Sequence, residues 1–296
     1  MSDYRIITDS TCDLTQELVE ELDVDVIPMD FTIGTDCYKD YPDDRSISPH
    51  DFYSRISEGE SSTTNQISMV TFEEAFEPYL RDGKNVLYLG FSSALSGTYN
   101  NSVLAARELA EKYPERTIRT VDTLCAAFGE GLLVWYAVQK KREGFSVEET
   151  AEWAEQNRLR LHHWFTVDDL NHLKRGGRIS GAAALMGTML GIKPVLHVDG
   201  KGGLTMIDKV RGRRQAAEDM VKHMEQTVEN AKDQMIFISH GDYQEGADYI
   251  QKLVTEKFGC TQFRVAPIGP VIGAHVGTGS VLLFYFGKDR EYGLKG

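Results

Sequence analysis

The sequence has few cysteines and no long apolar segment, and each absence excludes a class of protein. Its cysteines are widely scattered, and no Cys-x-x-Cys pair occurs among the four: Cys12, Cys37, Cys125 and Cys260. This spacing argues against a zinc site and against a disulfide framework, and free thiols are typical of a cytoplasmic protein. No segment approaches the roughly 20 apolar residues that a membrane-spanning helix needs.

Positive charge is also scarce. The 32 lysines and arginines are outnumbered by 45 aspartates and glutamates, which gives a formal net charge of -13 at pH 7. Nucleic acids and anionic lipid surfaces are bound through basic faces, so we expect neither partner and no stable membrane insertion. The first residues, MSDYRIITDS, enter a strand at once and lack the apolar core of a signal peptide. We therefore expect a cytoplasmic protein, with no metal and no cofactor.

Length and periodicity together predict two α/β domains. A chain of 296 residues fits two domains at about 150 residues each. In the first half, short apolar strands alternate with helices, a pattern typical of a doubly wound, mainly parallel sheet. After about residue 162 two strands flank the turn DGKGG, which predicts a hairpin and a mixed, partly antiparallel sheet. The predicted domains are residues 1–161 and 162–296, with the ligand site between or near them.

Three segments bear on the position of a ligand. VDVIPMDFTI (24–33) is predicted as one strand, and SSTTNQIS (61–68) as a hydroxyl-rich loop before a helix. IGPVIGAHVGTG (268–279) is interpreted as an apolar loop that holds one histidine, His275. Its glycines allow the backbone to approach a ligand closely. In a parallel sheet, ligands bind at the carboxyl ends of the strands, where we expect Ser10, Ser96 and Asp122.

The stretch GFSSALSGTY (90–99) joins an apolar strand to a helix and puts Ser96 where that helix begins. Ser96 has two interpretations besides catalysis. Its hydroxyl either caps the helix or holds an anion together with the free backbone N–H groups of the first turn, beginning at Gly97.

A serine hydrolase of lipid esters is the alternative function. Ser96 would be the nucleophile and His275 the base, with Asp122 or Asp168 as the third member. The match is poor, because a nucleophile elbow reads G-x-S-x-G and here neither outer position is glycine.

Two short segments concentrate positive charge in this acidic chain. KVRGRR (209–214) brings together Arg211, Arg213 and Arg214, and LKRGGRIS (173–180) forms a second basic stretch. The first is either a solvated helix start or a cationic cluster, and the second either a basic patch or a glycine turn.

Five motifs in order resemble the DegV family over nearly the whole chain. They are ITDSTCDL, FSSALSGTY, FTVDDLNHLKRGGRIS, IKPVL and IGPVIGAHVG. DegV proteins are bacterial cytoplasmic fatty-acid-binding proteins, and some present the bound fatty acid to a separate fatty acid kinase. The resemblance implies two α/β domains with a long-chain fatty acid, such as palmitate, buried between or within them. It also implies that the chain binds its ligand without catalysis. A third hypothesis, besides the carrier and the hydrolase, is a subunit that holds no lipid and scaffolds a phosphotransfer enzyme.

The resemblance also implies which residues hold the ligand. Ser96 and Thr64 match the residues that contact the fatty-acid carboxylate, and Gly97 follows at the helix start. His275 matches a third headgroup residue. Arg211 matches an arginine that lies near the headgroup in kinase-linked members, where it would serve a phosphate or the partner.

The sequence departs from the family pattern in one loop. Asn65 and Ile67 replace the usual serine and proline, which predicts a different loop shape and leaves Thr63 as an alternative to Thr64. Thr278 stands where many members have proline or another small residue. We expect the apolar walls to come from GLLVWYAV (131–138) and AAALMGTMLG (182–191), which both also suit a plain core.

Overall fold

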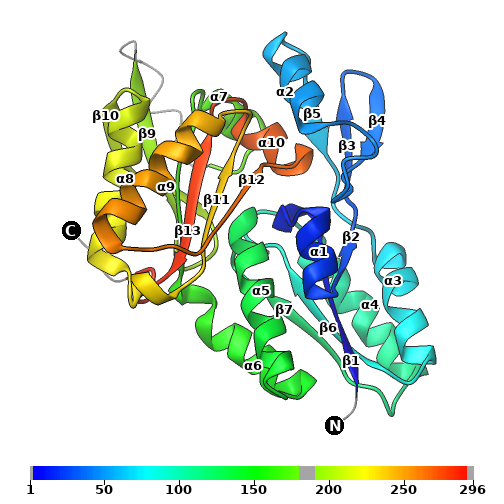
Figure 1. Ribbon diagram of the computed structural model, residues 1–296. Coiled ribbons are helices and arrows are strands. Elements are labelled where there is room, and N and C mark those ends of the chain that lie inside the picture. The colour runs from blue at the N-terminus through cyan, green and yellow to red at the C-terminus, as the bar shows by residue number, and fades with distance from the viewer. Residues whose placement is uncertain (1–2, 180–190, 292–296) are drawn as a thin grey trace.

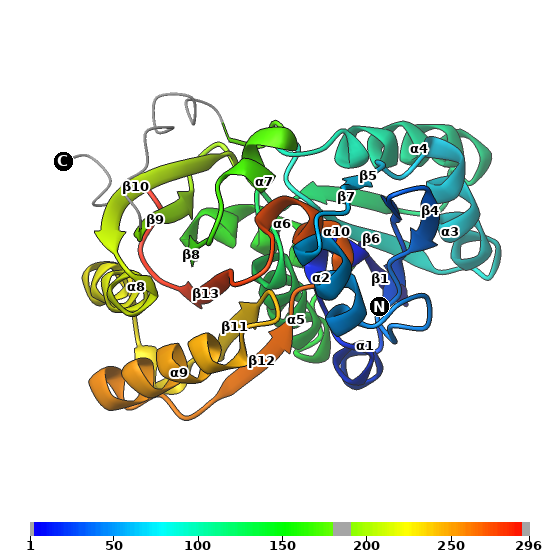
Figure 2. The same ribbon diagram turned by 90° about the horizontal axis from the view of Figure 1, so that it is seen from above.

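The computed structural model describes residues 3–179 and 191–291. Three β-sheets organise this part of the chain, with helices packed on and between them (Figures 1 and 2). The predicted α/β architecture is confirmed, with a parallel sheet, a mixed sheet and a third, smaller sheet that the sequence analysis missed.

Sheet A is the doubly wound sheet of the first half. Its strands run parallel in the order β2-β1-β6-β7: β1 (Tyr4–Asp9), β2 (Asp25–Ile27), β6 (Asn85–Gly90) and β7 (Ile118–Asp122). The helices of this half are α1 (Gln16–Leu22), α3 (Met69–Arg81), α4 (Thr98–Lys112), α5 (Phe128–Arg142) and α6 (Val147–Asn157). Helices α3 and α4 pack together on one face of the sheet, and α5 and α6 cover the other (Figure 1). A capping box formed by Ser146 and Glu149 starts α6.

Sheet C is mixed, as predicted. Its order is β10-β9-β8-β13-β11-β12, and β11–β12 is its parallel pair: β8 (Leu161–Thr166), β9 (Ile192–Val198), β10 (Leu204–Arg211), β11 (Ile236–His240), β12 (Phe263–Pro267) and β13 (Val281–Phe286). Helices α8 (Arg213–Thr227) and α9 (Gln244–Phe258) cover one face, and α5 packs against the other. The short helix α7 (Asn171–Arg175) follows β8.

Sheet B is the antiparallel sheet that was not predicted. It contains β3 (Asp30–Ile33), β4 (Asp36–Lys39) and β5 (Ser62–Thr64) in the order β4-β3-β5. Helices α2 (Pro49–Ser57) and α10 (Pro270–Val276) lie beside it in Figure 1, and α10 contacts β3 and β5. A helix near the end of the chain therefore packs on a sheet from its first quarter.

Three predictions for local structure were wrong. The strand expected over residues 24–33 is two strands in different sheets, because Pro28 cannot donate to a ladder and ends β2. Part of the expected loop at 61–68 is β5, whose three residues are too few to show strand periodicity. The apolar loop at 268–279 contains helix α10, which Pro270 starts at a position that tolerates proline.

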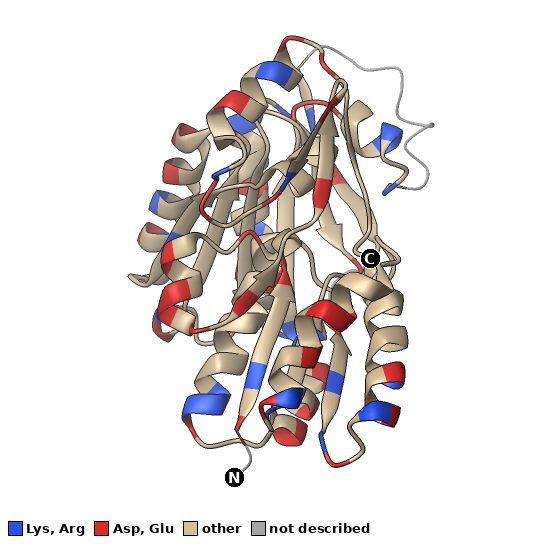
Figure 3. Ribbon diagram, turned by 90° about the vertical axis from the view of Figure 1, so that its right-hand side faces the viewer, with Lys and Arg blue, Asp and Glu red and all other residues tan. Residues whose placement is uncertain are grey.

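The predicted boundary between residues 161 and 162 remains a prediction. The strands of sheets A and B come before it, and those of sheet C begin at Leu161. Contacts cross it through α5 and α10. In the described ranges, no helix is long and apolar enough to cross a membrane. In the ribbon view of Figure 3, acidic and basic positions are interspersed along the helices, and the basic positions form no continuous stripe.

Candidate functional site

An apolar cavity of about 350 Å³ lies where the three sheets meet. Sheet C contributes aromatic and aliphatic side chains from β8 and β13, and helix α10 contributes three apolar residues and one histidine. The turn before α4 and the end of β5 contribute polar groups. Among the lining residues are Thr64, Ser96, Gly97 and His275, so the structure brings together the four residues predicted to hold a carboxylate.

Thr64 and His275 are joined directly across 211 residues of sequence. Thr64 Oγ1 and His275 Nε2 lie 3.0 Å apart in a hydrogen bond, and α10 packs on β5 at this point. The neighbouring Thr63 bonds Thr32 Oγ1 at 2.7 Å instead and does not line the cavity. Successive side chains of a strand point to opposite faces, so β5 directs Thr64 to the cavity and Thr63 away from it.

Ser96 lies one residue before the cap of α4. The helix begins at Thr98 with Gly97 as its N-cap, so the interpretation of Ser96 as the cap was wrong by one residue. Ser96 Oγ accepts a hydrogen bond from the Thr98 amide at 3.2 Å and lies 3.0 Å from Thr98 Oγ1. The cap itself makes no side-chain hydrogen bond. The positive end of the helix macrodipole is therefore directed at the cavity wall that Ser96 and Gly97 form.

The loop after β5 is fixed to the start of α4. The Ile67 amide donates to Thr98 Oγ1 at 3.3 Å, and the Asn101 side-chain amide donates to the Ile67 carbonyl at 2.7 Å. The proline that the family usually has at position 67 could not donate the first bond. Gln66 lies close to Gly97: a Cβ at position 97 would stand 2.1 Å from Gln66 Oε1, so a larger residue there would push the exposed Gln66 side chain aside.

Arg178 is a cavity residue that the sequence analysis did not single out. Its Nε donates to the Leu95 carbonyl at 3.0 Å, and its Nη1 donates to the Gly176 carbonyl. These bonds place the guanidinium beside the turn that carries Ser96 and close enough to His275 to affect its charge. The signal was present in the basic stretch LKRGGRIS, which was interpreted only as a patch or a turn.

His275 is neutral in this environment at physiological pH. Burial, together with the smaller effects of the nearby Arg178 and His172 charges, lowers the pKa of its imidazole to about 4. Its Nδ1 is buried and has no hydrogen-bond partner within the described ranges. A Cβ at Gly176 would lie 2.2 Å from that nitrogen, so the ring packs directly on the backbone of this glycine.

His163 forms part of the opposite, apolar wall, and the sequence analysis also missed it. Its Nδ1 donates to the Leu161 carbonyl at 3.1 Å, and its Nε2 accepts from the Ala126 amide at 3.3 Å. Burial lowers the pKa of His163 well below the ordinary value. Both nitrogens are used by the backbone, so this histidine presents a neutral ring edge to the cavity beside Phe284.

The residues of the hydrolase alternative are not arranged as a triad. In the described part of the chain, no hydrogen bond joins Ser96 to His275. Asp122 accepts from the backbone near its own strand. Asp168 is held by Lys193 and Arg213, whose hydrogen bonds outweigh burial and leave its pKa lowered. A catalytic histidine base needs an aspartate that orients its imidazole, and neither Asp122 nor Asp168 does this for His275.

Arg211 and the predicted walls lie away from the cavity lining. Arg211 is exposed at the end of β10, and it is not among the residues that line the cavity. Residues 131–138 lie in the middle of α5, mostly buried, and also do not line the cavity, so of the two interpretations the plain core fits them and the wall does not. The other predicted wall, 182–191, falls outside the described residues except for Gly191.

Solved structures with the same fold are closely similar to this chain. A DegV family protein from Thermus thermophilus, named for fatty acid binding, shares 30% identity with a TM-score of 0.85, over 97% of this chain and 100% of its own. A Thermotoga maritima protein, whose structure is said to reveal a fatty-acid-binding function, shares 28% identity with a TM-score of 0.84, over 97% of this chain and 100% of its own.

Sequence comparison agrees with the structural comparison. A DegV domain-containing protein of Clostridium perfringens is 42% identical over 291 residues, which is 98% of this chain and 100% of the relative. The family model described as an uncharacterised protein of the DegV family matches residues 3–288. The chain therefore belongs to the DegV family.

Proposed function

We propose that this protein binds a long-chain fatty acid, with the tail in the apolar cavity and the carboxylate held by Thr64, Ser96, His275 and the Gly97 amide. The fatty acid binding of the Thermus thermophilus and Thermotoga maritima neighbours supports this ligand class. The cavity volume of about 350 Å³ lies within the range of about 300 to 1,000 Å³ that is usual for small-molecule sites.

The observation that carries the proposal is a cluster of polar groups in the wall of an otherwise apolar cavity. Hydroxyls of Thr64 and Ser96, the start of α4 and the imidazole of His275 all line it. Such a wall suits a ligand with one anionic end and a long apolar remainder. A buried carboxylate without these partners would be strongly disfavoured.

Arg178 supplies fixed positive charge to the same region. Its guanidinium is anchored by two backbone carbonyls, so its position changes little when a ligand enters. A carboxylate near a guanidinium keeps its ionised form on leaving water, because the opposite charge offsets part of the desolvation cost. Arg178 therefore completes the proposed carboxylate site.

The tail contributes most of the proposed affinity. A fatty acid of about 16 carbons gains about 0.8 kcal/mol for each buried methylene, an upper bound of about 12 kcal/mol. A hydrogen bond to its charged end contributes about 1.5 to 3 kcal/mol. The polar groups thus mainly orient the ligand, and a variant that lacks one of them should still bind.

The proposed role includes presentation of the bound fatty acid to a separate fatty acid kinase. Arg211 is exposed, and its side chain makes no hydrogen bond or ion pair among the described residues, which leaves the guanidinium free for a phosphate or a partner. Arginine suits bidentate contact with phosphate.

Native mass spectrometry of the gently purified protein tests the proposal. We expect an added mass that matches a fatty acid of 14 to 18 carbons, a range that follows from the family resemblance. A mass without any added ligand, also after incubation with palmitate, would contradict it. Turnover of a p-nitrophenyl ester that is lost in Ser96→Ala would favour the hydrolase instead.

Matched control variants are available at both hydroxyl positions. Thr63 lies next to Thr64 but bonds Thr32 outside the cavity, and Ser93 lies in the same turn as Ser96 but does not line it. Thr63→Ala and Ser93→Ala should bind palmitate like the wild type. Weaker binding in the controls than in Thr64→Ala and Ser96→Ala would place the carboxylate elsewhere.

A further inference from the structure

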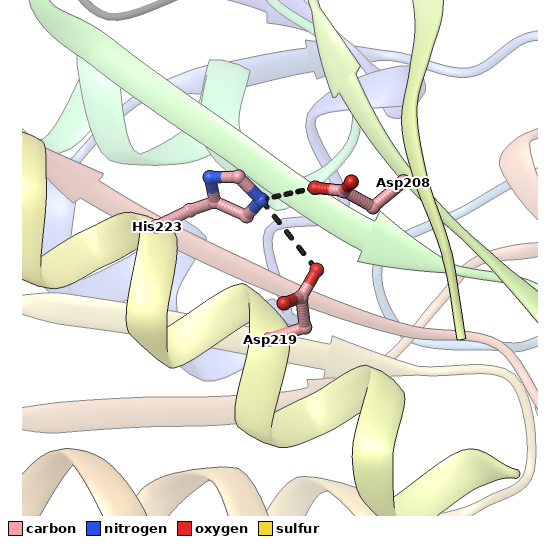
Figure 4. Close-up of side chains that lie close together, drawn as sticks. All are labelled: Asp208, Asp219 and His223. Carbon is pink, nitrogen blue, oxygen red and sulfur yellow. Dashed lines mark hydrogen bonds and ion pairs between the residues drawn. The ribbon is translucent and has the colours of Figure 1, made fainter. Parts of the chain in front are cut away.

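Three potential metal ligands converge on the far side of sheet C from the cavity. His223 and Asp219 project from α8, and Asp208 projects from β10 toward them (Figure 4). His223 Nε2 lies 2.7 Å from Asp208 Oδ2 and 3.5 Å from Asp219 Oδ2. The three donor atoms all lie within 4.8 Å of one another.

The local sequence explains how the helix supplies two of the ligands. Asp219 and His223 are four residues apart, so they lie on the same face of α8, one turn from each other. That face packs on sheet C, since α8 contacts β8, β9 and β10. The spacing alone is weak evidence, because residues at i and i+4 often form ordinary ion pairs.

A β-bulge supplies the third ligand. The pairing of β10 with β9 shifts between Met206 and Asp208, which leaves Ile207 as an extra residue. Before the bulge, Met206 packs on the core that adjoins the cavity, and after it Val210 packs on the core beneath α8. Without the extra residue, position 208 would share a face with Met206. The bulge therefore turns Asp208 toward His223, as bulges next to functional sites commonly do.

The imidazole cannot satisfy both carboxylates by itself. One ring nitrogen carries at most one hydrogen, and the short contact to Asp208 occupies it. Asp219 is 9% exposed, and its Oδ2 has no hydrogen-bond partner in the described part of the chain. A buried carboxylate oxygen that accepts no hydrogen bond is costly, and a cation shared by all three residues would remove that cost.

The histidine ring is held in a fixed orientation. It stacks on Trp164 with ring centroids 4.1 Å apart and an interplanar angle of 7°. Trp164 is itself anchored, because its Nε1 donates to Tyr285 Oη at 2.9 Å. A coordinating side chain that is already fixed in position loses little conformational entropy when a metal binds, and such preorganisation is a general requirement for a high-affinity site.

We propose that Asp208, Asp219 and His223 bind a divalent transition-metal cation such as Zn²⁺ or Mn²⁺. Imidazole suits zinc and other transition metals, and carboxylates suit harder cations, so the mixed donor set favours these two over Mg²⁺ and Ca²⁺. Tetrahedral ligands about 2.0 to 2.2 Å from a zinc ion stand about 3.4 Å apart. The distances from His223 Nε2 to Asp208 and Asp219, 2.7 and 3.5 Å, lie on either side of that spacing. The side chain of Asp208 is 45% exposed, so it can move to reach the tetrahedral distance. Water would complete the coordination sphere.

This site was not expected from the sequence, because its residues form no recognisable metal-binding motif. It also does not depend on the proposed lipid function. The two sites lie on opposite faces of sheet C. The paired residues Met206 and Leu196 belong to the core on the cavity side, whereas Val195, the partner of Asp208, belongs to the core beneath α8.

Isothermal titration of the EDTA-treated full chain with ZnCl₂, and separately with MnCl₂, tests the site. We expect one equivalent of at least one of the two metals to bind, with at least tenfold weaker binding in Asp208→Asn and in Asp219→Asn. Mutating a residue that only hydrogen-bonds to a metal ligand already lowers metal affinity about 10- to 100-fold, so loss of a ligand itself should cost at least tenfold. The side chain of Asp208 is nearly half-exposed, so its variant should fold normally, and circular dichroism checks this.

Asp242→Asn is the matched control, because Asp242 also pairs with a histidine, His50, at 3.3 Å but lies outside the cluster. It should bind the metal like the wild type. In NMR spectra, Zn²⁺ should shift the ring signals of His223 before those of His50. The proposal would be overturned if the wild type bound neither metal, or if Asp208→Asn and Asp219→Asn bound the metal as tightly as the wild type. Either result would show that the cluster is an ion pair only.

Discussion

Replacing His275 with glutamine should remove most of the pH dependence of fatty acid binding. Without ligand, burial together with the Arg178 and His172 charges holds the pKa of His275 at about 4, compared with an ordinary value of 6.5. The ring is therefore almost entirely neutral at pH 7.5. A carboxylate bound next to it favours the protonated form, so binding should raise this pKa.

The size of the effect follows from the two pKa values. If the carboxylate restores the ordinary value of 6.5, about nine-tenths of the bound protein is protonated at pH 5.5, compared with a few per cent of the free protein. Because the bound state then takes up a proton, affinity should rise about tenfold from pH 7.5 to pH 5.5, which is about 1.4 kcal/mol. Conversely, binding weakens as pH rises through the raised pKa of the complex.

Displacement of a fluorescent fatty acid by palmitate at several pH values measures this dependence. Ionisation of the ligand itself affects both proteins equally, so the informative quantity is the difference in slope between the wild type and His275→Gln. NMR titration of His275 with and without palmitate measures the pKa directly. Equal slopes in the two proteins, or a pKa that does not rise on binding, would refute the charge-pairing role of His275.

The other predictions concern the remaining residues of the proposed site. Thr64→Ala and Ser96→Ala should each weaken palmitate binding by about 1.5 to 3 kcal/mol in the same displacement assay, because each removes a hydrogen bond to a charged acceptor. Arg178→Gln should weaken binding by a similar amount and raise the pKa of His275 in the ligand-free protein, since Arg178 now lowers it; an unchanged pKa by NMR would contradict the proximity of the two charges. Arg211→Ala should leave palmitate affinity within about 0.5 kcal/mol, as is usual for a surface change, but slow acyl phosphate formation by a cognate kinase. Loss of binding in Arg211→Ala with an intact fold would instead assign this arginine to the carboxylate.

The sequence predicted the large elements well because their signals are local. Alternating strands and helices over the first half define sheet A, and the turn DGKGG marks the hairpin of β9 and β10. Sheet B was missed because its strands have three or four residues, which is too short for a period of two to stand out. The glycines of residues 268–279 concealed α10 for a related reason, since they lower helix propensity without preventing a short, buried helix.

The site was less accessible to local patterns than the fold. Thr64, Ser96 and His275 were predicted to form one site from family motifs rather than from periodicity, because these three residues lie on elements far apart in the sequence. Arg178 was missed because its charge is next to glycines that also suit a turn, and only the fold brings it beside Leu95. The sequence left residues 131–138 open between cavity wall and core, because a buried apolar helix has the same pattern in either place.

The packing of α10 on sheet B also affects when the site forms during synthesis. Tyr53 donates to the Ile268 carbonyl at 3.1 Å, and the Gly269 amide donates to Asp13 at 3.0 Å, so this sheet and its surroundings are covered by residues translated much later. A sheet this small needs a hydrophobic face or packing against a helix for independent stability, and α10 supplies part of that packing. A nascent chain that has emerged only to residue 260 can therefore form sheet A but has no partner for Thr64. Ligand binding should appear late and abruptly on the ribosome, after His275 has left the exit tunnel.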